Sequence, residues 1–157
     1  MIIKRALFVK IQIYKIENQI PMKVFLLTMS VIVCFPILLT GQRMNPEDIV
    51  QKQLDAYNSR NLEVFLACYT EDVEVYNFRE SEPMIRGIEA CKKIYANVFD
   101  SSPELKATID NRIILGNKVV DHEKVTGMKG VDLIEVVAIY EVKDNLIYRV
   151  TFIRKGR

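Results

Sequence analysis

One short segment of the chain carries three titratable side chains in a row, Asp121-His122-Glu123, with valines on both sides. Apolar flanks of this kind are typical of a strand, and successive side chains of a strand point to opposite faces. Asp121 and Glu123 therefore share one face, and His122 lies on the other. Either face would bring a proton-transfer group into the interior, because an imidazole or a perturbed carboxylate can act as a general base near neutral pH.

The same segment also has an interpretation without chemistry. Ion pairs are common on sheets, so these residues can form a charged outer face with one inward residue held in a salt bridge. Arg112, on the preceding strand, is the counter-ion we expect if the two carboxylates point inward. We name His122, Asp121 and Glu123 as candidate catalytic residues, and alternation alone does not decide which face is inside.

Other kinds of catalytic site have no support in the sequence. His122 is the single histidine and has no neighbouring cysteine, so we expect no metal site. Glycine-rich phosphate loops, dinucleotide motifs and the nucleophile elbow of hydrolases are absent, so we expect no cofactor. Cys68 and Cys91 are interpreted as buried hydrophobic residues, and a disulfide between them is the alternative.

The elements that must position these side chains begin with helices. Asn45-Pro46-Glu47-Asp48 is typical of a helix start, since asparagine caps free amides, proline suits the first turn and acids face the positive end of the dipole. Asn61 can cap a second, short helix. Apolar residues from Ile88 to Phe99 recur at helical spacing and predict a third helix, which Ser101-Ser102-Pro103 ends.

Strands account for the rest of the chain. Residues 73–78 alternate apolar and polar side chains and predict an early strand. After Leu105, turn signals at 116–117, 127–130 and 143–145 separate four long strands of an antiparallel meander. The predicted fold class is α+β, with three helices packed on the concave face of a curved antiparallel sheet. Residues 42–157 form a single domain.

The segment from Tyr57 to Phe78, YNSRNLEVFLACYTEDVEVYNF, holds a helix end, a polar turn, a short helix and the first strand. It resembles the opening of the cone-shaped NTF2-like families, which include the SnoaL-like cyclases and the steroid delta-isomerases. The element order extends this resemblance over residues 44–154. The resemblance implies a cone that encloses a small molecule.

The resemblance also implies where an isomerase would hold its catalytic groups. That enzyme uses an aspartate base at the end of the first strand, a tyrosine on the first helix and a protonated aspartic acid on a late strand. These positions fall on Asn77, Gln53 and Ala138. Asparagine takes up no proton at a useful pH and alanine donates no hydrogen bond, so we do not expect isomerisation by that mechanism.

Several residues remain candidates for ligand binding. Gln53 and Asn77 place amides where the family's pocket opens, and the alternative is that backbone groups or each other satisfy them. Tyr57 and Tyr140 offer flat apolar area with a hydroxyl, and Tyr140 shares a face with Ala138. Arg112 completes this set of candidate ligand-binding residues.

The first 41 residues have the pattern of an export leader. An apolar run from Val24 to Leu39 follows Lys23 and further basic residues, and it is shorter than the roughly 20 residues that span a bilayer comfortably. We expect the domain to be exported, periplasmic or secreted, with Met22 as an alternative start. An uncleaved signal anchor is the other interpretation, and membrane contact is expected only through this leader.

Removing the leader changes the charge of the chain. Residues 1–41 hold five of the 22 basic and one of the 20 acidic residues, which leaves 17 against 19 in the domain. A net charge of −2 excludes the basic surface that nucleic-acid binding needs.

Residues 131–140 are apolar on both faces of the strand that they predict. An antiparallel sheet with one wet face should alternate, so the second face needs a cover. Because the helices cover only the concave face, we expect a homodimer through the convex sheet face.

Two functions remain open at this stage. The first is an exported NTF2-like domain that binds a small, mostly apolar molecule in its cone without catalysis. The alternative is a SnoaL-like acid–base enzyme, of isomerase, cyclase or dehydratase type, that uses His122 or the Asp121/Glu123 pair. The absence of the three isomerase groups favours binding, whereas the charged residues of the predicted strand still allow an enzyme.

Overall fold

The computed structural model describes residues 45–155 of the chain. Its elements are α3 (Pro46–Asn58), α4 (Leu62–Leu66), β1 (Tyr69–Asn77), β2 (Ile85–Arg86), α5 (Ile88–Ser101), β3 (Lys106–Leu115), β4 (Lys118–Thr126), β5 (Ile134–Lys143) and β6 (Leu146–Arg154). The predicted export leader lies outside the described residues and stays a prediction. None of the helices within residues 45–155 is long and apolar enough to cross a membrane.

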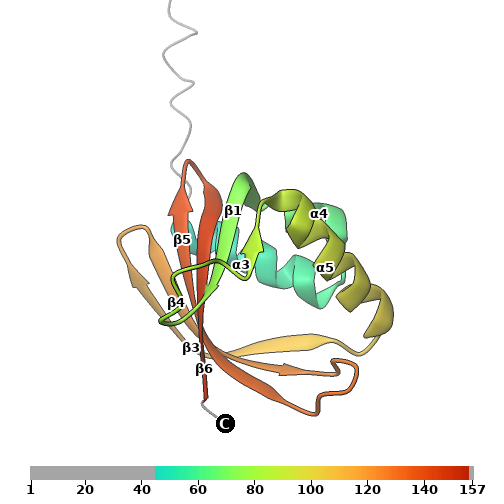
Figure 1. Ribbon diagram of the computed structural model, residues 1–157. Coiled ribbons are helices and arrows are strands. Elements are labelled where there is room, and N and C mark those ends of the chain that lie inside the picture. The colour runs from blue at the N-terminus through green and yellow to red at the C-terminus, as the bar shows by residue number, and fades with distance from the viewer. Residues whose placement is uncertain (1–44, 156–157) are drawn as a thin grey trace, which may run out of the picture. The chain divides into compact units, whose positions relative to one another are not determined.

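The six strands form one curved sheet in the order β2-β1-β6-β5-β4-β3, and the three helices lie against one of its faces (Figure 1). This confirms the α+β class with three helices on a curved sheet. The sheet is mixed rather than purely antiparallel, because β6 pairs parallel with β1. Alternation in the sequence shows that a segment is a strand, but it carries no information on the direction of the strand's neighbour.

The predicted caps hold the helices in place. The Asn45 side chain accepts a hydrogen bond at the start of α3, where a capping box with Asp48 completes the turn. Asn61 caps α4 by accepting from the Val64 amide at 3.1 Å. These side chains satisfy amides that a helix leaves free in its first turn, which fixes where each helix begins.

An aromatic cluster joins the helices to the start of the sheet. It consists of the rings of Tyr57, Phe65, Tyr69, Tyr95 and Phe99. The centroid distances range from 4.4 Å, between Phe65 and Tyr95, to 6.3 Å, between Tyr57 and Tyr95. Cys68 and Cys91 are buried and free, which agrees with their interpretation as hydrophobic residues. The ring contacts of Tyr57 with Tyr95 and Phe99 hold helix α5 against α3.

Asn58, at the last position of α3, fastens that helix to the sheet. Its side-chain amide donates to the Ala107 carbonyl at 3.0 Å, and its oxygen accepts from the Ala107 amide at 2.7 Å. The Asn58 side chain thus pairs with the backbone of β3 as a neighbouring strand would, although Ala107 is 49 residues further along the chain. Helix α3 is therefore held at a fixed distance from the strands that form the floor of the site described next.

Candidate functional site

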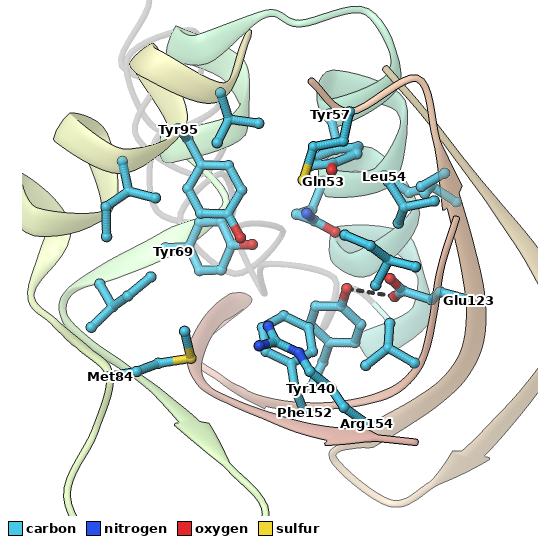
Figure 2. A pocket seen from close by; sticks show the side chains of 18 residues that line it. Gln53, Leu54, Tyr57, Tyr69, Met84, Tyr95, Glu123, Tyr140, Phe152 and Arg154 are labelled. Atoms are coloured by element: carbon cyan, nitrogen blue, oxygen red, sulfur yellow. Dashed lines mark hydrogen bonds between the residues drawn. The ribbon is translucent and has the colours of Figure 1, made fainter. Parts of the chain in front are cut away.

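A cavity of about 190 Å³ lies between the helices and the concave face of the sheet (Figure 2). Most of its wall is apolar. The apolar residues are Leu54, Met84, Ile85, Ile94, Val98, Ala107, Val125, Met128, Ile134, Val136 and Phe152. The polar residues are Gln53, Tyr57, Tyr69, Tyr95, Glu123, Tyr140 and Arg154.

Strand β4 decides which charged groups reach the interior. Buried and partly exposed residues alternate along the whole strand, and the buried set is Val119, Asp121, Glu123 and Val125. The two carboxylates therefore point toward the helices, and His122 points to the outer face. The sequence did not decide which face of this strand is inside, and the structure shows that it is the face of the two carboxylates.

Glu123 is the carboxyl group of the cavity. It is only 6% exposed, and the Tyr140 hydroxyl donates a hydrogen bond of 2.7 Å to its Oε1 atom, which Figure 2 shows as a dashed line. Burial raises the pKa of Glu123 to about 7, and the neighbouring Asp121 charge adds to this. The Tyr140 hydrogen bond and the charge of Arg112 lower the same pKa, but they do not outweigh burial.

Asp121, two residues earlier on the same face, has a different role. It is 1% exposed and forms two hydrogen bonds with Arg112, from Nε to Oδ1 and from Nη2 to Oδ2, both 2.7 Å long. Arg112 also donates to the Gln51 side chain at 2.9 Å and lies 3.7 Å from Glu47. The ion pair thus ties β3 and β4 to helix α3, and neither Asp121 nor Arg112 lines the cavity.

Three further tyrosines line the cavity besides Tyr140. Figure 2 shows Tyr69 and Tyr95 across the space from Glu123, and Tyr57 beside Gln53. Burial raises the pKa of all three hydroxyls, and the Glu123 charge raises each further, so they stay neutral hydrogen-bonding groups at physiological pH. Tyr69 was missed by sequence reasoning, because its position at the start of β1 gives no periodic signal.

His122 lies away from the cavity. Its side chain is 39% exposed on the outer face of the sheet, and its Nε2 atom lies 2.9 Å from Glu135 Oε1 on the neighbouring strand. The structure therefore does not bring the imidazole to the interior. No group of three or more potential metal ligands occurs within the described part of the chain.

Comparison with known proteins identifies the family. The sequence pattern of the SnoaL-like domain matches residues 50–150. The chain belongs to the SnoaL-like family. No curated protein sequence matches it.

Several solved structures share the fold of this chain. An uncharacterised cystatin-fold protein from Novosphingobium aromaticivorans is 26% identical, with 71% of this chain and 99% of that chain covered and a TM-score of 0.66. An NTF2-like protein of unknown function from Cytophaga hutchinsonii is 15% identical over 74% of this chain and 95% of its own, with a TM-score of 0.61. A proposed ketosteroid isomerase from Kribbella flavida is 23% identical over 71% and 78%, also with a TM-score of 0.61.

In this SnoaL-like domain, the three residues for which the resemblance predicted isomerase positions lie in different surroundings. Gln53, the predicted counterpart of the tyrosine, is 6% exposed and lines the cavity. Asn77, the predicted counterpart of the base, is not part of the wall, and its side-chain amide donates to Glu80 at 3.4 Å. Ala138, the predicted counterpart of the late acid, is fully buried and lies opposite Asp121. The carboxyl group in the cavity wall is that of Glu123, on the neighbouring strand β4.

Proposed function

We propose that this SnoaL-like domain encloses a small, mostly apolar molecule and binds it without transforming it. The observation that carries the proposal is the cavity, an apolar space with a few hydrogen-bonding groups converging on it. Its volume of about 190 Å³ is below the roughly 300–1,000 Å³ of sites for drug-sized ligands, which favours a molecule with a single ring.

Filling the cavity should abolish binding. Val136 is 5% exposed, lines the cavity and lies directly opposite Glu123, so Val136→Phe would place a ring in the space that the ligand needs. We expect at least a tenfold loss of affinity for single-ring compounds found by native mass spectrometry and measured by calorimetry. Val131→Phe makes the same substitution at a position that is 43% exposed and should leave affinity unchanged. Equal binding by both variants would place the ligand outside the cavity.

The raised pKa of Glu123 supports a second candidate function, acid–base catalysis. A carboxyl with a pKa near 7 is suited to general acid–base catalysis, and this one faces a cavity that holds neutral tyrosine donors. Glu123 would accept a proton from a carbon next to a carbonyl, and a tyrosine hydroxyl would bind the oxygen. Deuterium exchange into small cyclic ketones, compared between the wild type and Glu123→Gln, tests this alternative. Exchange that is equal in both proteins would exclude it.

We also propose that two copies associate through the convex face of the sheet. Val120, Val137, Ile139 and Ile153 point outward from three adjacent strands and stay partly exposed in the single chain. A partner would remove this apolar area from water. Such a face on the central strands is typical of an interface rather than of a solvated surface.

Light scattering after size-exclusion chromatography should therefore give the mass of a dimer. Ile139→Lys puts a charge in the centre of the convex face and should yield monomers, because a buried unpaired ammonium is costly. Phe78→Lys removes another exposed apolar side chain, 52% exposed, from a loop outside that face and should leave the dimer intact. A wild type that elutes as a monomer at micromolar concentration would contradict the proposal.

A further inference from the structure

We propose that the molecule enclosed by the cavity is an organic amine, bound as its ammonium ion to Glu123 while its apolar part fills the remaining space. This inference rests on the proposed binding function and adds the chemical class of the ligand. It follows from three features of the cavity: a carboxyl without a paired cation, aromatic walls, and a single basic wall residue whose charge is exposed to solvent.

The Glu123 carboxyl has no cation of its own. Its partner in hydrogen bonding is the Tyr140 hydroxyl, which is neutral. The nearest basic group on this face, Arg112, gives two hydrogen bonds to Asp121 and a third to Gln51. A buried carboxylate is costly unless a positive charge is paired with it, and an ammonium ion entering the cavity would supply that charge.

The walls suit a cation as well as an apolar group. The rings of four tyrosines and of Phe152 surround the space, and an aromatic face attracts a cation that comes within about 6 Å of its centroid. The Gln53 amide and the tyrosine oxygens can accept hydrogen bonds from the remaining N–H groups of an ammonium ion. Together these groups can replace the water that a small ammonium ion loses on entry.

One basic residue contributes to the wall, and its position weakens its repulsion. Arg154, at the end of β6, is exposed to solvent, and its guanidinium lies 5.3 Å from the centroid of the Phe152 ring. Water and salt screen an exposed charge of this kind far better than they screen the interior. Arg154 therefore marks the mouth of the cavity rather than the place of the ligand's charge.

Protonation of Glu123 gives the proposal a pH dependence. The groups that face it are Tyr140 on β5, Asp121 with Arg112, Tyr57 on α3, Tyr95 on α5, Tyr69 on β1 and Arg154 at the mouth. The tyrosines stay neutral and Arg112 stays charged between pH 6 and 8, so the change of charge in this range belongs to Glu123. Since its pKa is about 7, the ionised fraction, and with it amine affinity, should rise about tenfold from pH 6 to pH 8.

The experiment compares matched pairs of ligands that differ in charge but hardly in shape. Benzylamine and benzyl alcohol, and cyclohexylmethylamine and cyclohexylmethanol, are titrated by calorimetry and by NMR at pH 6 and pH 8. We expect each amine to bind at least tenfold more tightly than its alcohol at pH 8. In Glu123→Gln this preference should disappear together with its pH dependence. Glu135→Gln removes an equal charge from the outer face and should retain both.

The possible results separate this inference from the binding proposal. An alcohol that binds as tightly as its amine at pH 8, in a manner that Val136→Phe abolishes, overturns the amine proposal and leaves the cavity as the binding site. An amine preference that survives in Glu123→Gln overturns the role of Glu123. If no member of any pair binds, both the inference and the proposed function fail. Thermal unfolding of each variant verifies that it is folded before titration.

Discussion

Replacing Arg112 with alanine should destabilise the domain by about 3–5 kcal/mol, the usual cost of leaving one partner of a buried ion pair alone. Asp121 is 1% exposed, and both of its oxygens accept from Arg112. Without the guanidinium, a buried carboxylate keeps neither its water nor its partner. Helix α3 also loses its link to the sheet through Gln51 and Glu47. Urea unfolding followed by circular dichroism measures the change.

Two further variants test whether the loss comes from the buried charge. Arg86→Ala removes an arginine that is 65% exposed and pairs with Glu74, so it should cost less than about 1 kcal/mol. The double variant Arg112→Met, Asp121→Leu removes both charges and should recover most of the stability, because a buried pair is often replaceable by apolar residues. If Arg112→Ala unfolds at the same urea concentration as the wild type, Arg112 does not compensate the buried charge of Asp121.

Replacing Glu123 with glutamine should have the opposite effect and stabilise the domain above neutral pH. The pKa of Glu123 is about 7 in the folded protein, against an ordinary value of 4.5. Between these values the folded state binds a proton that the unfolded state has released, so stability falls as pH rises from about 4.5 to about 7 and then levels off. The full loss is about 3 kcal/mol for a shift of this size.

Glutamine keeps the hydrogen bond from Tyr140 but does not titrate, so it avoids this loss. The two proteins should have similar stability near pH 4.5 and differ by about 3 kcal/mol at pH 8, with the variant more stable. Chemical unfolding at several pH values gives the difference directly. Glu104→Gln, at an exposed position before β3, serves as the control and should follow the wild-type curve. A difference between Glu123→Gln and the wild type that stays constant from pH 5 to pH 8 would contradict the raised pKa.

The two predictions describe two buried carboxylates that the fold treats differently. Asp121 has a permanent cation that compensates its buried charge, whereas Glu123 has none and destabilises the domain once it is ionised. Carboxyl groups with a strongly raised pKa cluster at functional sites, which supports the proposal that a ligand contacts Glu123. The proposed amine would offset the cost of ionising Glu123, which links the pH dependence of stability to that of binding.

Local features of the sequence predicted most of the fold. The caps at Asn45 and Asn61, the turns after Leu115 and Lys143, and the alternation along β1 fixed the helices and strands near their observed positions. These signals act within a few residues of the chain, so they can be recognised without knowing the rest of the structure. The short strand β2, of two residues, offered no such signal.

The candidate site could be predicted only as a set of alternatives. Alternation showed that Asp121 and Glu123 share a face of the strand. It did not show which face is inside, because each of the two faces also carries a valine. A shared face also did not mean a shared role. Arg112 binds Asp121 and not Glu123, because the strand register places it directly opposite Asp121.

The sequence by itself thus determined the class of fold and the caps and turns. Only the tertiary structure decided that Glu123 reaches the cavity, that His122 lies outside it, and that Asn77 stays off its wall. The physical reason is that a side chain's type and its strand face are local properties. Its burial and its charge partner depend on helices and strands that are far away in the chain.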